Sequence, residues 1–188
     1  MASSYNLHYP LYIISNFLLF SIPFTSSTFS ENLIQSVTTA RAEKTTKLHF
    51  YFQDKLSGKN PTAVKIIGGE GFGFGTTFMI DDALTQELAR DSKVVGRAQG
   101  TYSLAAQNDL ALLMVVTFTF TEGDYNGSSI SLLGRNHVYD DVREMPIVGG
   151  SGLFRLGRGY ALAHTGWFDP DTGDASVEYN VTVMHFEN

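Results

Sequence analysis

A strict two-residue alternation in residues 110–121 constrains the fold most strongly. In its second half, VTFTFT (116–121), apolar and hydroxyl side chains take turns. Side chains of a strand point alternately to opposite faces, whereas a helix would scatter these threonines around its circumference. The segment therefore predicts a strand with one apolar face. Lys47 to Asp54 (KLHFYFQD) alternates in the same way and predicts another.

Turn signals separate several further strand-like segments. Asn126-Gly127 is typical of a hairpin, and Asp169 to Gly173 (DPDTG) is a strong turn. We predict the remaining strands at residues 63–67, 76–80, 94–104, 128–133, 161–168 and 177–186. No segment carries a sustained helical stripe. About eight strands with regular turns indicate an all-β barrel or sandwich.

Three other segments are predicted to be irregular. Residues 134–160 combine four arginines with many glycines and a proline, which predicts a shaped loop between strands. Asp81-Asp82 is predicted to begin a turn. The loop GGEGFGFG (68–75) is followed by neither a Lys-Ser/Thr pair nor a helix, so a phosphate-binding role is disfavoured. Its phenylalanines are expected to cover a barrel end or a ligand.

The composition narrows the function classes. A chain of 188 residues with 43% hydrophobic residues suits one well-buried domain. A net charge of −6 argues against a nucleic-acid binder. There is no cysteine, so the fold must close by packing and hydrogen bonding alone.

The N-terminal segment predicts secretion. Residues 1–30 contain no charged side chain, and Leu11 to Phe20 is an apolar run too short to span a bilayer, which favours a cleaved signal peptide. A polar lead-in (31–46) and one domain (47–188) are expected to follow. Sequons at Asn126 and Asn180 predict N-glycosylation.

The residues taken alone leave the site open. The sequence has no histidines at metal-ligand spacing and no dinucleotide fingerprint, so no metal or cofactor is expected. It also lacks the G-x-S-x-G elbow of hydrolases. What remains is a set of polar residues, Asp54, Tyr102, Asp140, Asp141, Arg143 and Glu144. These form either structural ion pairs or a pocket in which a buried carboxylic acid transfers protons. For Asp54, which ends an apolar row, spacing favours a solvated strand end.

Five segments, in order along the chain, resemble the plant dirigent proteins. They are FYFQD (50–54), VGRAQGTY (95–102), YNGSSISLLGRN (125–136), VREMPIVGGSGLFRLGRGYA (142–161) and GDASVEYNVTV (173–183). The resemblance covers the chain from about Lys47 onward.

The resemblance implies an eight-stranded antiparallel β-barrel, a homotrimer, and secretion to the apoplast. It also implies a role without cofactor or metal, in which an apolar lumen holds phenolic radicals or quinone methides and sets their stereochemistry. In the lignan branch a separate oxidase or laccase makes monolignol radicals, and the barrel aligns two of them.

Matched residue by residue, the resemblance implies catalytic roles for Asp54, Tyr102 and Arg143. Asp54 is the acid ending the first strand, Tyr102 a lumen tyrosine, and Arg143 the arginine of the VRE motif. We further expect five residues to bind substrate, namely Phe52, Phe118, Asn136, Thr165 and Tyr179.

One departure divides the functional hypotheses. Lignan-directing members tend to carry an aspartate seven residues before the matched arginine, where this chain has Asn136. Asn136 cannot deliver a proton, and the cysteines of lignan-directing members are missing too. Both differences resemble the broader group that includes pterocarpan synthases, which dehydrate a 2′-hydroxyisoflavanol. Stereoselective coupling or closure, cofactor-free dehydration, and phenolic binding without turnover all stay open.

Overall fold

The computed structural model describes residues 42–69 and 71–186, which form one antiparallel sheet of nine strands. The strands are β1 (Glu43–Asp54), β2 (Ala63–Ile67), β3 (Thr77–Thr85), β4 (Val94–Leu104), β5 (Ala111–Phe120), β6 (Ser129–His137), β7 (Arg143–Ser151), β8 (Arg158–Phe168) and β9 (Ala175–Phe186). Short 3-10 turns, η1 (Gly123–Tyr125) and η2 (Gly152–Phe154), lie between β5 and β6 and between β7 and β8. The predicted signal peptide lies outside the described residues.

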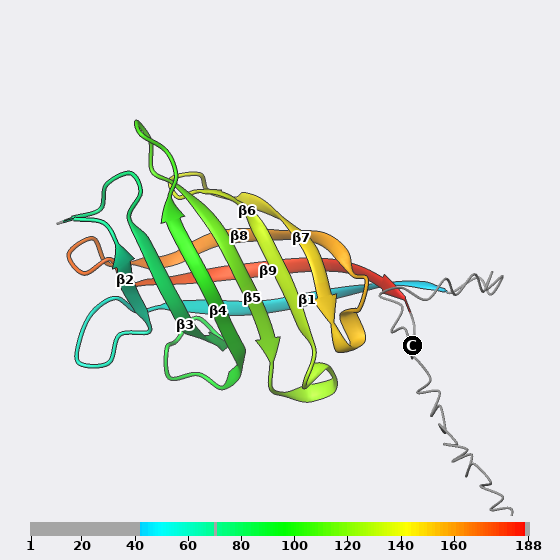
Figure 1. Ribbon diagram of the computed structural model, residues 1–188. Helices are drawn as coiled ribbons and strands as arrows, with labels where there is room; N and C mark the ends of the chain where they lie inside the picture. The colour runs from blue at the N-terminus through cyan, green and yellow to red at the C-terminus, as the bar shows by residue number, and fades with distance from the viewer. Residues whose placement is uncertain (1–41, 70, 187–188) are drawn as a thin grey trace, which may run out of the picture. The chain divides into compact units, whose positions relative to one another are not determined.

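The sheet closes on itself. Its order is β1-β9-β8-β7-β6-β5-β4-β3-β2, and β1 also pairs with β3. Eight strands therefore form a ring (Figure 1). The ninth, β2, pairs with the part of β3 that β1 does not reach. The eight-stranded antiparallel β-barrel expected from the sequence is confirmed. No helix among residues 42–69 and 71–186 has the length and apolarity of a membrane span.

Aromatic side chains pack against one another inside the barrel. Phe50 of β1 contacts Phe118 of β5 edge to face, with 5.1 Å between ring centroids, and stacks on Tyr179 of β9 at 5.8 Å. All three are buried. Thr117 and Thr119 take the other face of β5, as the alternation predicted. In β9, Asn180 is exposed between the buried Tyr179 and Val181, also as expected.

One strand was not predicted. β7 lies within the stretch 134–160, which we expected to be a loop. Arg143, Met145 and Ile147 are buried, and the residues between them are exposed. The alternation is short and is interrupted by Pro146 and a glycine pair, so it was hidden in the sequence.

Several strand boundaries also differ from prediction; β6, for example, ends at His137 and not at Leu133. β3 continues through Asp81 and Asp82, where a turn was expected, as far as Thr85. Adjacent acids are typical of turns, yet here one side chain is exposed and the other is buried inside the barrel. β1 begins at Glu43 rather than at Lys47, inside the predicted lead-in.

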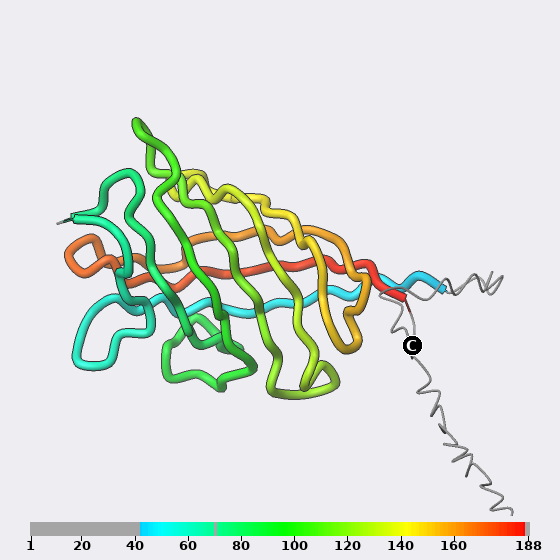
Figure 2. Tube along the Cα trace, in the orientation of Figure 1, coloured from blue at the N-terminus to red at the C-terminus, as the bar shows by residue number. Residues whose placement is uncertain are grey.

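Three loops gather at one end of the barrel. The chain leaves β1 after Asp54 and enters β9 at Ala175, and these two residues pair. The β1–β2 loop (55–62), residues 71–75 and the β8–β9 loop (169–174) therefore lie together at the end opposite to the start of β1 (Figure 2). We call this end the acidic mouth, because Asp54 and Asp174 lie there.

An apolar row crosses the outer face of the sheet. The members are exposed hydrophobic residues on β2, β3, β5 and β6, namely Val64, Met79, Val115 and Leu133. Val64 pairs with Met79 and Val115 pairs with Leu133, while Thr101 of β4 lies between Met79 and Val115. The row therefore consists of two apolar pairs separated by one threonine, and exposed apolar surface of this kind is typical of protein interfaces.

Candidate functional site

The barrel has a seam where β1 and β2 share one edge of β3. β3 pairs with β1 through residues 83–85 and with β2 through residues 77–80. Asp81 and Asp82 occupy the short gap between these two ladders, where the Asp81 amide donates to the Thr62 carbonyl at 2.9 Å. The alternation of β3 turns the Asp82 side chain into the barrel.

Asp54 comes to the same seam from β1. The ladder pairs Phe52 with Leu84 and Gln53 with Ala83, so the next position of β1, Asp54, comes opposite Asp82. Directly opposed residues of an antiparallel pair lie about 5 Å apart at their Cβ atoms. The seam thus places two carboxyl groups side by side, and the predicted solvated strand end for Asp54 is wrong.

Neither carboxyl group is fully hydrogen-bonded. Asp82 is 0% exposed, and the Thr62 hydroxyl donates to its Oδ1 atom. Its Oδ2 atom is buried without a partner. Asp54 as a whole residue is half-buried, yet its Oδ1 atom is likewise buried without a partner. Buried polar atoms in native proteins are nearly always paired, so the two exceptions mark a candidate site.

Burial raises the pKa of both carboxyl groups, so they stay protonated to a higher pH than usual. It raises the pKa of Asp54 well above its ordinary value, and the neighbouring charge of Asp82 raises it further, while the nearby Tyr102 hydroxyl offsets part of the rise. Burial also raises the pKa of Asp82 to about 7, against the hydrogen bond from Thr62. At mildly acidic pH the seam therefore holds carboxylic acids that can donate protons.

Tyr102 stands in an aromatic wall beside Asp54. Its ring stacks on Phe78 at 5.1 Å between centroids, and Phe78 stacks on Phe72 at 5.6 Å. Phe72 is nevertheless 59% exposed and Phe74 is 61% exposed, so a covering role for this loop stays a prediction. Burial, followed by the charge of Asp54, raises the pKa of Tyr102, so it remains a neutral phenol.

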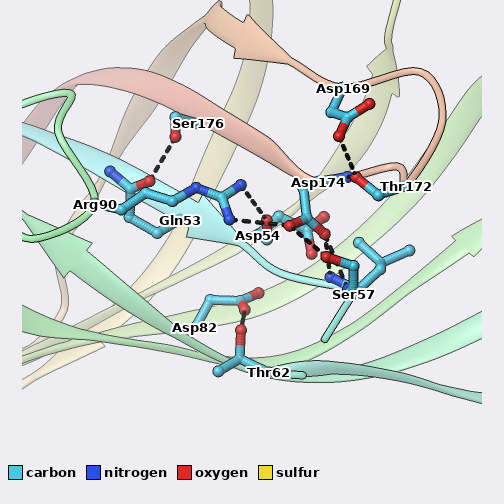
Figure 3. A network of polar contacts seen from close by, with 11 residues as sticks. Gln53, Asp54, Ser57, Thr62, Asp82, Arg90, Asp169, Thr172, Asp174 and Ser176 are labelled. Carbon is cyan, nitrogen blue, oxygen red and sulfur yellow. Dashed lines mark hydrogen bonds and ion pairs between the residues drawn. The ribbon is translucent and has the colours of Figure 1, made fainter. Parts of the chain in front are cut away.

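A third carboxylate, Asp174, has the opposite character. It accepts hydrogen bonds from the Leu56 amide at 2.8 Å and from both the amide and the hydroxyl of Ser57 at 3.0 and 2.9 Å (Figure 3). Arg90 donates to Asp174 at 3.0 Å and to the Asp54 carbonyl at 3.3 Å. Burial alone would raise the pKa of Asp174, but these hydrogen bonds outweigh it and lower the pKa. Asp174 is therefore an ionised anchor for the loop after Asp54.

Arg143 and Asn136 form a separate polar pair on neighbouring strands. The Arg143 Nε atom donates to Asn136 Oδ1 at 3.1 Å, and both residues are buried. Burial lowers the pKa of Arg143, although a guanidinium remains charged. Tyr179 is influenced by both Arg143 and Asp54. Burial raises the pKa of Tyr179, the charge of Arg143 opposes the rise, and the charge of Asp54 adds to it.

The other predicted residues take simpler positions. Phe52 and Phe118 are buried against Tyr179, with centroid distances of 6.1 and 5.2 Å. Thr165 is half-buried, in the inward row of β8 with the buried Ala163. The structure thus brings Asp54 to Tyr102 and Asn136 to Arg143, with the predicted aromatic residues between them.

The remaining polar candidates lie outside the lumen. Asp140 pairs with His137 at 2.6 Å, Asp141 with His164 at 3.2 Å, and Glu144 is exposed. Among the residues that the structure describes, no group of three or more His, Cys, Asp or Glu side chains is placed to hold a metal ion.

Asp82 and Asp174 were not predicted as site residues. Asp82 was assigned to a turn, although Phe78, Ile80 and Leu84 form an inward row with it at two-residue spacing, and that row is the signal for it. Asp174 directly follows the predicted turn 169–173 and received no assignment, and no spacing rule marks it.

An open groove of about 580 Å³ adjoins the acidic mouth through Arg90 and is also lined by Leu88, Ala89, Trp167 and Ser176. Ser176 alternates with the inward-facing residues of β9, and Trp167 pairs with it, so the groove lies on the outer side of the barrel. We therefore place the candidate site at the seam and not in the groove.

Comparison with known proteins fits this geometry. Residues 45–184 match the family model described as "Dirigent-like protein". The chain belongs to the dirigent family. It is 53% identical to Dirigent protein 23 of Arabidopsis thaliana over 148 residues, which cover 76% of this chain and 79% of the relative.

Pterocarpan synthases are also among the relatives. Pterocarpan synthase 1 of Glycine max is 45% identical over 175 residues, covering 90% of this chain and 93% of that protein. The solved structure of the pterocarpan synthase dirigent protein PsPTS1 matches with a TM-score of 0.74 and 46% identity, over 77% of this chain and 97% of the other. The dirigent barrel and its match to pterocarpan synthases are thus both established.

The seam acids predict an unusual pH dependence of stability. A carboxyl group whose pKa is raised on folding stabilises the protein below its unfolded pKa, and that stability is lost as pH rises through the folded pKa. For Asp82 the two values are 3.8 and about 7. The free energy of unfolding, measured with urea between about pH 5 and about pH 8, should therefore fall with rising pH by less in Asp82→Asn than in the native protein.

Asp81→Asn is the matched control. Asp81 is exposed, and its hydrogen bond to Arg97 lowers its pKa. This variant should keep the native fall in stability above about pH 5. An equal fall in Asp82→Asn and in the native protein would contradict the assignment of Asp82 as a buried, protonated acid.

Proposed function

We propose that the protein dehydrates a phenolic alcohol and closes the resulting quinone methide, as a cofactor-free lyase of the pterocarpan-synthase type. The observation that carries the proposal is Asp54, a buried acid with a strongly raised pKa beside the neutral phenol of Tyr102. A carboxylic acid kept protonated in an apolar enclosure is suited to protonating a leaving hydroxyl. The 45% identity to the Glycine max pterocarpan synthase supports the same reaction class.

Each step of this reaction uses groups that the chain supplies. Asp54 gives its proton to the hydroxyl at C4 of a 2′-hydroxyisoflavanol, the C4–O bond breaks, and water leaves. The phenol conjugated with C4 loses its proton, which restores the acid and gives a neutral quinone methide. The 2′-hydroxyl oxygen then bonds to C4 while its proton returns to the quinone oxygen. One water is lost, and no electrons are exchanged with an oxidant.

Tyr102 and Arg143 have orienting roles in this proposal. Tyr102, held in the aromatic wall with Phe78, donates a hydrogen bond that positions a substrate oxygen near Asp54. Arg143, fixed by Asn136, stabilises negative charge that develops on the quinone oxygen. Phe52, Phe118 and Tyr179 enclose the apolar rings, and Thr165 faces the same lumen.

Dehydration without an oxidant is the direct test. The mature protein, incubated with the isoflavanol alone, should form pterocarpan, which mass spectrometry detects as loss of water. Asp54→Asn should lower kcat at least about 100-fold, because general acid catalysis typically contributes that much. Asp91→Asn, an exposed acid in the β3–β4 loop, should keep native activity. No turnover by the native protein would exclude this function.

A second candidate is control of radical coupling. The stacked wall of Phe72, Phe78 and Tyr102 offers flat surfaces on which phenolic rings align. The 53% identity to Dirigent protein 23 supports a guiding role as much as an enzymatic one. The radicals would come from a separate oxidase or laccase.

Coniferyl alcohol with a one-electron oxidant separates this candidate from the first. A guiding protein should give enantiomerically enriched dimers in chiral chromatography, and Tyr102→Phe should reduce the enrichment because the orienting hydroxyl is lost. Racemic dimers from the native protein would rule out coupling control. Binding of the phenols without enrichment or turnover would instead leave a binding role in defence or the cell wall.

Assembly into a homotrimer is a further part of the proposal. The apolar row of Val64, Met79, Val115 and Leu133 supports it, because such a row is costly to leave in water. Sedimentation of the mature protein should give a trimer mass, and Leu133→Lys should shift it toward the monomer. Val142→Lys, at an exposed apolar residue in the β6–β7 loop, should stay trimeric. A native monomer would reject the assembly.

Secretion to the apoplast and glycosylation stay predictions. Asn126 and Asn180 are both exposed, as glycan acceptors must be.

A further inference from the structure

Two buried carboxyl oxygens face the lumen without hydrogen-bond partners. They are Oδ1 of Asp54 and Oδ2 of Asp82, and no other buried side-chain nitrogen or oxygen in the described part of the chain is unpaired. The second oxygen of Asp82 is held by Thr62, so the acid has one fixed atom and one free atom. Free buried acceptors on two neighbouring strands suit a ligand that is polar at one point.

The seam explains why the two acids act as a unit. Asp54 comes opposite Asp82 where the ladder between β1 and β3 ends. Two negative charges directly opposite each other on a sheet are unfavourable. One proton shared between the acids relieves this repulsion, and the pair then presents one hydrogen-bond donor and one acceptor.

An alcohol hydroxyl is complementary to such a pair. It has one hydrogen to donate and lone pairs that accept. We propose that Asp54 and Asp82 together bind the hydroxyl group that leaves the substrate, which makes Asp82 a second catalytic residue. The identity of that hydroxyl rests on the dehydration proposed above, whereas the two-acid site itself does not.

The pair remains complementary after the bond breaks. The protonated acid gives its proton to the hydroxyl oxygen, the electron pair of the C–O bond stays on that oxygen, and water forms between two carboxylates. Water has two hydrogens and donates one to each. The proton released from the conjugated phenol then restores the shared state, so the pair returns to its starting charge.

The neighbouring polar residues leave the hydroxyl group to Asp54 and Asp82. Asp174 is already satisfied by Leu56, Ser57 and Arg90, so it does not compete for the hydroxyl. At the other polar pair, Asn136 donates no proton and holds Arg143. The second acid of this barrel therefore lies across the seam from Asp54 instead of at position 136.

Binding of a non-reactive alcohol tests the site independently of turnover. The probe is an isoflavan-4-ol whose conjugated phenol is methylated, so that no neutral quinone methide forms, and its partner is the same compound without the 4-hydroxyl. Calorimetry of the native protein should show about tenfold tighter binding of the alcohol, the size expected for hydrogen bonds to a charged group. Asp82→Asn should reduce this preference to within about twofold, and Asp81→Asn should keep it.

The pH profile of the native protein gives a measurement that needs no variant. The preference for the alcohol should be bell-shaped in pH, since the pair matches a hydroxyl only while it holds one proton. A merely structural Asp82 would leave Asp54 to titrate alone, and the preference would then change in a single step with pH instead of a bell. The hydrogen bond from Thr62 lowers the pKa of Asp82, so a bell that moves to higher pH in Thr62→Val would tie it to Asp82, should Asp82→Asn fail to fold.

The outcomes separate this site from the proposed function. Preference for the alcohol without any dehydration would support the two-acid site and reject the lyase. Dehydration with equal binding of both probes, or no binding of either, would overturn the site. A preference unchanged in Asp82→Asn would show that Asp54 acts alone.

Discussion

Closure of the barrel depends on a short ladder between β1 and β3. β1 pairs with β9 along its whole length, but only residues 51–53 pair with β3. β2 then continues along the rest of the same edge. Because a loop connects β1 to β2, the strand ladder along this edge of β3 is interrupted at Asp81 and Asp82, where the Asp81 amide binds the Thr62 carbonyl of that loop. The site exists because closure is incomplete at that point.

The apolar filling of the barrel gives the seam its chemistry. Phe50, Phe118 and Tyr179 exclude water from the centre, and loss of water raises the cost of ionising a carboxyl group. The same enclosure acts differently on Asp174, because hydrogen bonds from Ser57 and Arg90 replace its lost water. Protonation at the acidic mouth is therefore decided by the number of donors that each acid receives, and not by depth alone.

Local sequence patterns predicted the barrel better than its site. The VTFTFT alternation identified β5, since a strand has two faces with different neighbours. β7 was lost because Pro146 and two glycines carry no pattern, although Arg143, Met145 and Ile147 do. Family resemblance led to Asp54, Tyr102 and Arg143, which lie inside the barrel. It could not show that Asp54 meets Asp82, because that contact depends on how β1 and β3 are aligned at closure.

Thr62 influences the proton affinity of Asp82 from outside the barrel strands. Its hydroxyl donates the hydrogen bond that the Asp82 carboxyl receives, yet Thr62 itself belongs to the β1–β2 loop and not to a strand of the barrel. Loops accept substitution more readily than packed strands do. The proton affinity of an interior acid can thus drift during evolution through a loop residue, while the lumen wall stays constant. Related barrels with identical acids could in this way diverge in the pH at which they work.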